Sequence, residues 1–445
     1  MKSVKNYFIY GFSLSGKSAL NLIYNKKDEF FIYDNNTEIQ KEAEIYSKKF
    51  DNVYVLNSTN KTLLKTMDVF VISPGVSIYD NIIVWAKRNN KKIIGELELG
   101  FRKCRKKIIA ITGTNGKTTC VRLLTSILNF ANKKALGVGN IGYPLSQAVV
   151  DKKKVRYFVC EVSSFQLESI RYFKPKLACI LNITKDHINR HKTFKNYANT
   201  KKKICSNLTK KDFVVCQENL QINKTSGKIF NFGTKNTKNG CFLHKNNIIF
   251  SKNGKQQKVC SVNDFNLIGE HNLKNVLACV CLAKLLKVKN KFIIRALKDF
   301  TLSPHRLQKI YTYKSTVFYD DSKATNIDAT ICAIKSFNLP TTLILGGSDK
   351  GCNFDLIFSS LPNHIKFVLG CGEVKEKIEK SAKKFNKNVI LFNSLKEATN
   401  FACMKAQEVK NVLLSPACAS FDEFKNYKHR GEKFLEYIKD YYEKG

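Results

Sequence analysis

Short apolar runs bounded by turn residues recur along the chain, and helical patterns lie between them. Near the start, the runs KNYFIY (5–10), FFIYD (30–34) and DVFVISPG (68–75) predict strands. The stretch GFSLSGKSALNLIYNKK, which follows the first run, predicts a tight turn that leads into a helix. This alternation is typical of a small doubly wound α/β unit.

A second block begins with IAITGTNGKTTCVRLL (109–124), where a β-branched run leads through a glycine-rich turn into a helical pattern. The runs RYFVCEV (156–162) and LACILNIT (177–184) predict further strands, and residues 272–286 predict a long helix. Residues 217–260 are rich in Lys and Asn and less regular, with short β-like runs and turns.

A third block again alternates strands with turns or helix starts. Its predicted strands are STVFYDDS, TTLILGGSDKG, IKFVLGCG, NVILFN and NVLLSPACAS. We expect the basic stretch FRKCRKK (101–107) to link the first two blocks, and Ser303-Pro304 to mark the next boundary. Parallel sheets of this kind bind ligands beyond the carboxyl ends of their strands. The predicted domains comprise residues 1–103, 104–301 and 302–445.

The composition is that of a globular protein, since 43% of the residues are apolar. No apolar run reaches the roughly 18 residues of a membrane helix. Lys17 and several polar residues interrupt the apolar part of the N-terminal stretch, which therefore suits a strand, turn and helix better than a signal peptide. We expect a cytoplasmic protein that does not associate with a membrane.

The cysteine pattern favours buried thiols in a reducing compartment. The fifteen cysteines include no Cys-x-x-Cys pair, and Cys279 and Cys281 would lie on different faces of a helix. Metal ligation and disulfide bonds are therefore disfavoured.

The net charge of +40 raises the hypothesis of nucleic-acid binding. The lysines are spread along the chain, however, and Asn and Ile, which also have A/T-rich codons, are abundant. Genome composition is therefore the favoured cause, and we expect no nucleic-acid partner. The charge should still speed encounter with anionic substrates at low salt.

The glycine-rich turn of the second block predicts a phosphate-binding loop. Only two residues separate Gly113 from Gly116, whereas the common phosphate loop has four. Backbone amides at a helix start cradle phosphate, Lys117 can neutralise a terminal phosphate, and the Thr118 hydroxyl can bind Mg²⁺.

Two further strand ends carry groups that could complete a magnesium site. Glu161 ends one predicted strand, and Asp186 and His187 follow the next. Mg²⁺ prefers oxygen ligands, so Glu161 suits it better than histidine does.

The first block leaves two interpretations open. Gly11 and Gly16 lack between them the middle glycine that lets a pyrophosphate approach the backbone. Either a nucleotide-like ligand lies at the helix N-terminus with Asp34 at a strand end, or the glycines only turn the chain.

Eight motifs in one order resemble the Mur ligases, the ATP-dependent amide-forming enzymes of peptidoglycan precursor synthesis. They are GTNGKTT, GNIG, EVSSFQLE, NITKDHINRH, GEHNLKN, SPHR, DDSKATN and SPACASFDEF. SSFQLE, DDSKATN and LLSPACASFDEF are the specific ones, because the phosphate loop alone also fits folylpolyglutamate synthases. The resemblance spans nearly the whole chain. It implies three domains: an N-terminal Rossmann-like domain, a central P-loop ATPase-type domain with a mostly parallel sheet, and a C-terminal Rossmann-like domain.

Within the family, the chain is most similar to the enzymes that add D-glutamate to UDP-N-acetylmuramoyl-L-alanine. The resemblance implies that ATP phosphorylates the substrate carboxylate, and that the amine of D-glutamate then displaces phosphate from the acyl phosphate. Catalysis would rest on positioning and on charge neutralisation by Mg²⁺ and lysines.

The resemblance also assigns roles to individual residues. ATP would be bound by Gly113, Thr114, Asn115, Gly116, Lys117, Thr118, Thr119, Asn275, Arg306 and Asp321. The UDP-sugar would be bound by Leu14, Ser15, Asp34, Ser73, Pro74 and Asn140. D-glutamate would be bound by Thr325, Lys350, Ser420, Phe421 and Tyr427. The catalytic residues would be Lys117, Glu161, His187, Lys201 and Lys323.

The family's second metal site involves a lysine that CO₂ has converted to a carbamate. The metal ligands implied are Thr118, Glu161, His187 and Lys201 as its carbamate. Lys201 follows Tyr197 by four residues, but Lys202 and Lys203 stand beside it, and a solvated basic run is the alternative.

Two departures from the family pattern bear on metal affinity and kinetics. Lys185 stands where an acidic residue commonly precedes the Asp-His pair, and GGSDKG differs from the usual order before its lysine. Two alternatives remain: a related ligase with another amino-acid substrate, and a P-loop ATPase that binds nucleic acid. We expect a monomer.

Overall fold

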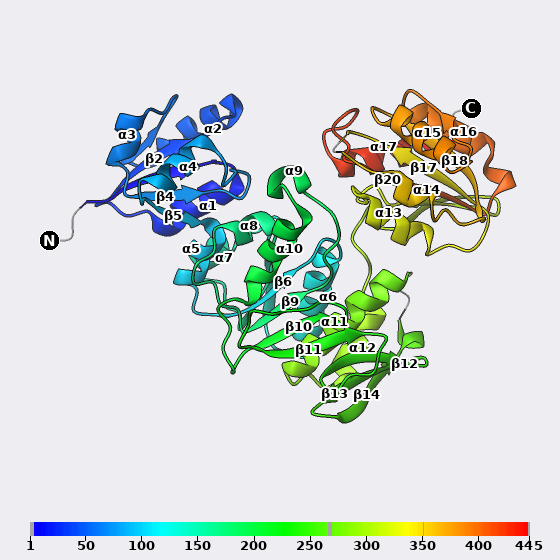
Figure 1. Cartoon of the computed structure of the whole chain (residues 1–445), viewed down its shortest axis with the longest axis horizontal. Coiled ribbons are helices and arrows are strands. Elements are labelled where there is room, and N and C mark those ends of the chain that lie inside the picture. Colours follow the sequence, from blue (N-terminus) through cyan, green and yellow to red (C-terminus); the bar gives the residue numbers. More distant parts are fainter. Residues whose placement is uncertain (1–3, 266–268, 350, 444–445) are drawn as a thin grey trace. The chain divides into compact units, whose positions relative to one another are not determined.

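The computed structural model describes residues 4–265, 269–349 and 351–443. These residues form two compact units, each described by itself. The first unit runs to Phe265 and includes Lys274–Phe300, and the second comprises the chain from Thr301 onward with the segment ending at Leu273. Figure 1 shows three sheets, each with helices beside it. The fold is α/β with three domains, as predicted, and each sheet lies within one predicted range; the exact boundaries remain predictions.

The N-terminal domain is a five-stranded parallel sheet in the order β3-β2-β1-β4-β5. Its strands are β1 (Asn6–Tyr10), β2 (Glu29–Tyr33), β3 (Val53–Val55), β4 (Val69–Ile72) and β5 (Lys92–Gly95). Its helices are α1 (Leu14–Ile23), α2 (Thr37–Ser47), α3 (Lys61–Thr66), α4 (Asn81–Arg88) and α5 (Glu96–Lys103). Apolar residues of both sheet faces are buried beneath these helices, which explains the short apolar runs.

The middle domain has a nine-stranded sheet in the order β14-β13-β12-β11-β10-β9-β6-β8-β7. Its parallel strands are β6 (Lys107–Thr112), β7 (Ala135–Gly139), β8 (Tyr157–Glu161), β9 (Leu177–Ile180), β10 (Phe213–Gln217), β11 (Lys228–Gly233) and β12 (Gly240–His244). The irregular region 217–260 extends the sheet through two antiparallel pairings, of β13 (Asn247–Lys252) with β12 and with β14 (Lys255–Ser261).

The helices of the middle domain follow its strands. They are α6 (Lys117–Phe130), α7 (Leu145–Val150), α8 (Ser164–Glu168), α9 (Ile188–His191), α10 (Phe194–Lys202) and α12 (Asn290–Asp299). The predicted long helix is α11 (Glu270–Leu285), whose first residues belong to the second unit.

The second unit contains a six-stranded sheet in the order β15-β16-β20-β17-β18-β19. Only the pair of β15 (Gln308–Tyr313) with β16 (Thr316–Asp320) is antiparallel among the described pairings of this sheet. The other strands are β17 (Thr341–Gly346), β18 (Ile365–Cys371), β19 (Ile390–Leu391) and β20 (Asn411–Ala417). The helices are α13 (Ile327–Ile334), α14 (Asp355–Phe358), α15 (Lys375–Lys384), α16 (Leu395–Met404) and α17 (Tyr427–Glu443).

The predicted linker 101–107 is wrong in extent. Residues up to Lys103 belong to α5, and β6 begins at Lys107. The helix continues this far because Arg102 pairs with Glu98 one turn earlier at 2.8 Å, and Phe101 packs edge-on against Phe173.

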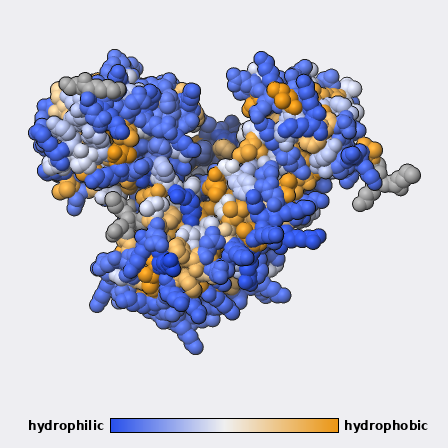
Figure 2. Space-filling view, turned by 180° about the vertical axis from the view of Figure 1, so that it is seen from behind, coloured by the Kyte–Doolittle hydropathy of each residue, from blue (hydrophilic) through white to orange (hydrophobic). Residues whose placement is uncertain are grey.

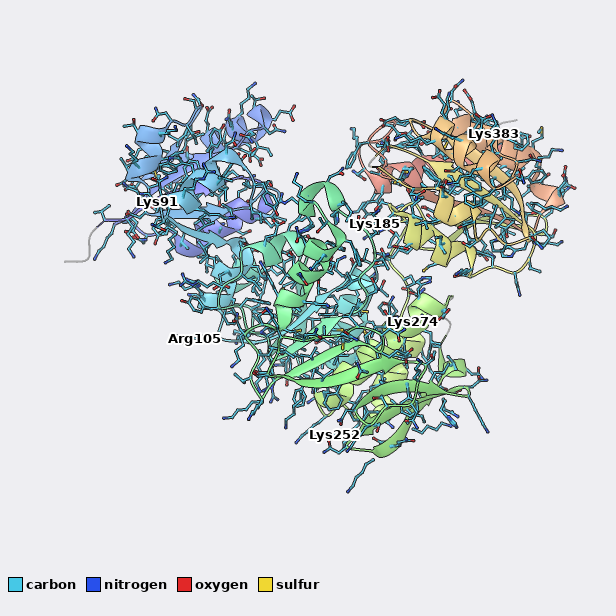
Figure 3. All side chains as sticks on the ribbon, viewed as in Figure 1. Lys91, Arg105, Lys185, Lys252, Lys274 and Lys383 are labelled. Carbon is cyan, nitrogen blue, oxygen red and sulfur yellow. The ribbon has the colours of Figure 1, made fainter. Side chains whose placement is uncertain are left out.

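The cysteines and the surface agree with a globular protein. All fifteen cysteines lie in the described part of the chain, none of them there forms a disulfide, and twelve are buried. No helix in the described ranges combines the length and apolarity needed to span a bilayer. Hydrophilic residues cover most of the face shown in Figure 2. Basic side chains extend from all three domains, among them Lys91, Lys252 and Lys383 in Figure 3.

Candidate active site

The glycine-rich loop connects β6 to α6, as predicted from its sequence. Gly116 has a left-handed backbone (φ 86°), and a Cβ built on it would lie 2.3 Å from Asn275 Oδ1, so a glycine is needed there. Lys117–Thr119 form the first turn of α6. Their amide groups and the helix dipole suit this end of the loop to a phosphate.

The segment after β9 holds the loop in this conformation. Asn182 accepts a hydrogen bond from the Asn115 N–H at 2.8 Å and donates one to the Asn115 carbonyl at 3.1 Å. The Thr114 hydroxyl lies 3.0 Å from the Tyr197 hydroxyl, and it accepts from the Thr184 N–H at 3.0 Å. The side chains of Thr114 and Asn115 thus shape the loop, while its amides remain the candidates for phosphate binding.

The side-chain nitrogens of two lysines converge on one carbonyl of the loop. Lys117 Nζ donates to the carbonyl oxygens of Gly113 and Thr114 at 2.9 and 2.8 Å, and Lys201 Nζ donates to the Gly113 carbonyl at 2.8 Å. Lys201 is 1% exposed, whereas Lys202 is half-buried and Lys203 exposed. The structure therefore selects Lys201 as the inward-facing lysine and excludes the solvated run for this residue.

The Lys201 amine lies in a site that disfavours its charge. Burial, followed by the neighbouring Lys117 cation, lowers the pKa of Lys201 well below its ordinary value. The nearby carboxylates of Asp186 and Glu161 act in the opposite direction. A neutral amine is the form that can react with CO₂, so the environment fits the predicted carbamate.

Glu161 ends β8 and is 2% exposed. Its Oε1 accepts a hydrogen bond from Asn140 Nδ2 at 3.0 Å, and its Oε2 is buried without a hydrogen-bond partner among the described residues. Within those residues, no three His, Cys, Asp or Glu side chains form a cluster that could hold a metal. The unpartnered, buried carboxylate oxygen of Glu161 fits the predicted magnesium ligand, because Mg²⁺ prefers oxygen donors.

His187 lies next to the same edge of the sheet. It precedes α9 in a left-handed conformation (φ 51°), and its ring packs edge-on against Phe165 with 4.9 Å between ring centroids. The His187 side chain is half exposed, with Nε2 3.5 Å from Asp186 Oδ2. The exposed ring is accessible to a metal, and neighbouring Lys185 is also exposed.

A pocket of about 170 Å³ brings together four of the six residues assigned to the UDP-sugar. They are Leu14, Ser15, Pro74 and Asn140, and the pocket is also lined by Glu96, Gly139, Gly142, Pro144 and Gln166. The first three come from the N-terminal domain and Asn140 comes from the middle domain. Neither glycine motif nor strand pattern indicated that these loops would line one pocket.

The other two UDP-sugar residues hold the loop after β1. Asp34 Oδ2 accepts from the Phe12 N–H at 2.7 Å, and Ser73 Oγ donates to the Gly11 carbonyl at 2.7 Å. Asp34 therefore has a structural role in addition to any contact with a ligand. Both interpretations of the Gly11 turn remain compatible with this geometry.

Glu96 and Gln166 also line this pocket, and neither was predicted as a site residue. The buried Glu96 Oε1 accepts from the Ser146 N–H at 2.8 Å and from its hydroxyl at 2.6 Å. Burial raises the pKa of Glu96, and these bonds and one from Gln166 oppose the rise. Gln166 lies within the family motif SSFQLE, and that motif could have indicated a site residue. Nothing in the sequence distinguished Glu96 from the neighbouring acidic residue of GELELG.

In the second unit, the predicted nucleotide residue Asp321 directly follows β16, and Arg306 lies just before β15. Asp321 Oδ2 accepts from the Ser415 hydroxyl at 2.9 Å, and its Oδ1 accepts from the Leu307 N–H at 3.2 Å. Burial raises the pKa of Asp321 to about 7, against the effect of Ser415, Leu307 and Arg306. Arg306 is half-buried. This carboxyl anchors the segment that carries Arg306 to the sheet.

Among the described residues assigned to D-glutamate, Thr325 follows β16 in the chain, and Ser420, Phe421 and Tyr427 follow β20. Lys323 Nζ lies 4.9 Å from the ring centroid of Tyr427, Ser420 is buried, and Phe421 is 66% exposed. Thr325 is exposed, and Lys350 lies outside the described residues.

Arg430 organises this region and was missed, because nothing in the sequence of α17 marks it as buried. Its guanidinium donates to the carbonyl oxygens of Cys418, Ala419 and Ser322 at 2.8–3.1 Å. Burial lowers the pKa of Arg430 to about 10. Arg430 thus holds together the ends of β16 and β20.

Comparison with known families agrees with the fold and the motifs. Three family descriptions match the chain: "Mur ligase MurD-like, N-terminal domain" over residues 5–95, "Mur ligase middle domain" over 111–283, and "Mur ligase, glutamate ligase domain" over 305–418. The chain belongs to the Mur ligase family.

Named relatives match over almost the whole length. The chain is 39% identical to "UDP-N-acetylmuramoylalanine--D-glutamate ligase" of Lachnoclostridium phytofermentans and 37% identical to the protein of the same name from Caldanaerobacter subterraneus, covering 98% of both chains in each case.

Solved structures share the fold at low identity. MurF from Acinetobacter baumannii matches with a TM-score of 0.62 and 16% identity, over 97% of this chain and 93% of that one. MurF ligase from Thermotoga maritima in complex with ADP matches with a TM-score of 0.60 and 14% identity, over 100% and 96%.

Proposed function

We propose that this protein is an ATP-dependent ligase that joins D-glutamate to UDP-N-acetylmuramoyl-L-alanine in peptidoglycan precursor synthesis. The relatives named for this activity match the chain over 98% of their length. The match of three Mur ligase domains in order supports the same reaction class.

One observation carries the proposal: the hydrogen bond of 3.0 Å between Asn140 and Glu161. Asn140 lines the pocket assigned to the UDP-sugar, and Glu161 ends the strand next to the phosphate loop. A sugar nucleotide in the pocket and a nucleoside triphosphate on the loop would therefore meet at one edge of the middle sheet. Amide formation through an acyl phosphate requires this proximity of carboxylate and γ-phosphate.

The chemistry follows from that arrangement. A carboxylate oxygen of the sugar nucleotide attacks the γ-phosphorus, and ADP leaves. The neutral amine of D-glutamate then attacks the carbonyl carbon, a proton is lost, and inorganic phosphate leaves as the amide forms. Lys117 at the start of α6 neutralises charge on the transferred phosphoryl group. Bound Mg²⁺, held by Thr118 and Glu161, would supply further neutralisation of that charge.

Lys201 is proposed to carry a carbamate. Its neutral Nζ would attack the carbon of CO₂ and lose a proton, which replaces an amine by an anionic group with two oxygens. His187 and this carbamate would then face the second cation together. The buried position of Lys201 and the lowered pKa of its amine support the proposal.

The C-terminal residues are proposed to bind D-glutamate and the nucleotide. Arg306, Asp321 and Lys323 would contact ATP and the transferred phosphate. Thr325, Lys350, Ser420, Phe421 and Tyr427 would contact D-glutamate. The protein would act as a cytoplasmic monomer without nucleic acid.

A phosphate-release assay tests the proposed function. The purified chain is given ATP, Mg²⁺, UDP-N-acetylmuramoyl-L-alanine and D-glutamate, and each component is omitted in turn. We expect phosphate release only with all four, and formation of an amide product by mass spectrometry. Release with L-alanine in place of D-glutamate would indicate a related ligase, and release stimulated by nucleic acid would reject a ligase.

A further inference from the structure

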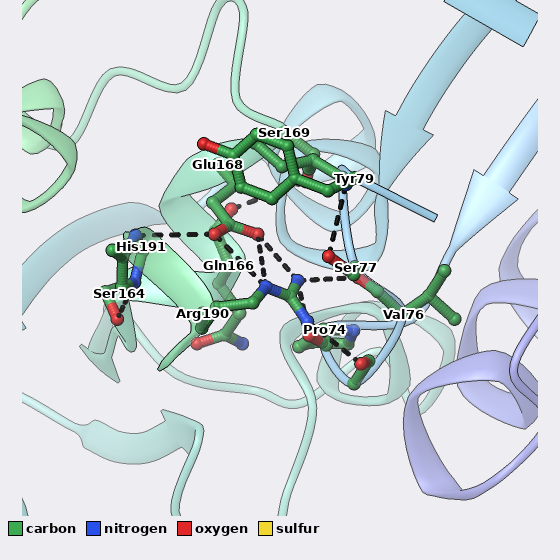
Figure 4. A network of polar contacts seen from close by, with 12 residues as sticks. Pro74, Val76, Ser77, Tyr79, Ser164, Gln166, Glu168, Ser169, Arg190 and His191 are labelled. Carbon is green, nitrogen blue, oxygen red and sulfur yellow. Dashed lines mark hydrogen bonds and ion pairs between the residues drawn. The ribbon is translucent and has the colours of Figure 1, made fainter. Parts of the chain in front are cut away.

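Arg190 of α9 is bound by groups from two domains (Figure 4). Its Nη2 lies 2.6 Å from Glu168 Oε2, and its Nε donates to the same carboxylate at 3.2 Å. The guanidinium also lies 4.7 Å from the ring centroid of Phe165. Glu168 and Phe165 belong to α8, so this side of the contact lies within the middle domain.

The other side of the guanidinium faces the N-terminal domain. Nη1 donates to the Gly75 carbonyl at 3.0 Å, and Nη2 donates to the Val76 and Pro74 carbonyls at 2.6 and 3.4 Å. These carbonyls follow β4 and belong to the loop that places Pro74 in the sugar-nucleotide pocket. Arg190 is 14% exposed at its side chain and Glu168 is 2% exposed, so the contact is largely shielded from water.

Glu168 extends the network toward the metal residues. Its Oε1 lies 3.5 Å from His191 Nδ1, and His191 Nε2 lies 3.0 Å from the Ser164 hydroxyl. Ser164 begins α8, three residues after Glu161 in the chain, and α9 begins directly after His187. One network therefore ties the Pro74 loop to the two segments that carry Glu161 and His187.

We infer that Arg190 is a positioning residue for the sugar nucleotide, which acts by holding the loop 74–76 against the middle domain. The inference rests on the proposed function for its substrate. Three main-chain carbonyls and one carboxylate need donors that point in different directions from one planar group. Arginine provides five such donors, whereas the ammonium of lysine is a single point.

The test replaces Arg190 conservatively. Arg190→Lys keeps the positive charge next to the buried Glu168, whose carboxylate would be left unpaired by an alanine. The single ammonium nitrogen of lysine cannot donate to the carboxylate and to all three carbonyls at the same time.

Arg102→Lys is a matched control. Arg102 likewise pairs with a buried carboxylate, Glu98, at 2.8 Å. Glu98 in turn accepts from main-chain N–H groups of Arg171–Phe173 in the middle domain. This pair also joins the two domains. Arg190, however, binds the carbonyl of the pocket residue Pro74, whereas neither Glu98 nor Arg171–Phe173 lines the sugar-nucleotide pocket.

Two readouts are measured for the wild type and both variants. They are the Kd for UDP-N-acetylmuramoyl-L-alanine by titration calorimetry, and the KM for each substrate during turnover. For Arg190→Lys we expect roughly a tenfold rise in the Kd and KM for the sugar nucleotide, about the contribution of one charge-assisted hydrogen bond. The KM values for ATP and D-glutamate should change by less than about twofold, and Arg102→Lys should leave all of these values near those of the wild type.

The results separate the inference from the proposed function. An unchanged Kd in Arg190→Lys, an equal rise in the KM for ATP, or an equal effect of Arg102→Lys would overturn the positioning role. A wild type that binds the sugar nucleotide without turnover would reject the proposed function, and the Kd comparison would still decide the inference. A wild type that binds no sugar nucleotide would overturn both.

Discussion

Replacing Lys201 by alanine tests the chemistry at the centre of the site. Lys201 Nζ lies 2.8 Å from the Gly113 carbonyl at the phosphate loop, and the residue is 1% exposed. An ammonium there would repel Mg²⁺, whereas a carbamate would attract it and supply oxygen ligands. If Lys201 is carbamylated, Lys201→Ala removes an anion beside the metal. If it is not, the variant removes only a buried amine whose charged form is disfavoured.

The expected loss of activity follows from the electrostatics. Two unit charges about 4 Å apart interact by about 4 kcal/mol at an effective dielectric constant near 20. A barrier raised by this amount slows turnover by on the order of 10³. The truncation also removes roughly three buried methylenes, worth about 0.8 kcal/mol each, so melting temperatures must be compared alongside rates.

The assay is phosphate release with and without a short carboxylic acid such as acetate or propionate. We expect Lys201→Ala to lose most activity and to recover part of it as the acid enters the vacated space and presents oxygens to the metal. The same acids should not rescue Lys117→Ala, because its missing group is a cation. Lys202→Ala, at the half-buried neighbour, should stay close to wild type.

Two results would refute this reasoning. Full activity of Lys201→Ala would exclude any role for the group in catalysis. Loss and rescue at Lys202 with an active Lys201→Ala would move the modified lysine by one position, against the burial that the structure assigns to Lys201.

Three further predictions concern other parts of the site. Lys117→Ala should lower kcat by about 10²–10³, because a cation is lost from the developing phosphate charge; near-normal turnover would mean that the loop is not catalytic. Asp34→Ala should raise the KM for the UDP-sugar and leave that for ATP nearly unchanged, with Asp34→Asn as the control that can still accept from Phe12. Glu96→Gln should make thermal stability less dependent on pH. Burial raises the pKa of Glu96, so the folded chain keeps a proton that the unfolded chain loses above about pH 4.3, and stability falls as pH rises through the raised value. Glutamine keeps an acceptor for Ser146. A melting temperature that falls with rising pH as steeply in Glu96→Gln as in the wild type would show that Glu96 does not cause the pH dependence.

Much of the fold could be predicted from local patterns. The strands β1, β2 and β4 begin and end within a few residues of the apolar runs that predicted them. Apolar residues of β1 and β4 are buried on both faces of the sheet, and those of β2 are buried on one face and partly buried on the other. The prediction of a linker over residues 101–107 was wrong in extent, because a run of basic residues was interpreted as a connection. Arg102 instead belongs to α5, which its ion pair with Glu98 stabilises. Composition alone could not reveal a partner that lies one helical turn away in a folded helix.

The candidate site was predicted in part. Motif spacing placed Lys117, Glu161 and His187 at the ends of neighbouring strands, and the structure brings these ends to one edge of the sheet because parallel strands share their carboxyl edge. The resemblance assigned Lys201 from its spacing to Tyr197, with Lys202 and Lys203 beside it leaving the register open, and it gave no role to Glu96 or Arg190.

The sequence by itself determined the α/β class, the phosphate loop and the family motifs, since strand period, glycine turns and short motifs are properties of neighbouring residues. Only the tertiary structure decided which lysine of residues 201–203 faces inward, because its partner Gly113 is 88 residues away. It also decided that Arg190 reaches Gly75, 115 residues earlier, and that Glu96 and Gln166 join the pocket residues that the resemblance had grouped. Such contacts depend on how whole sheets and helices pack against one another. No local pattern along the chain shows which distant residues that packing will bring together.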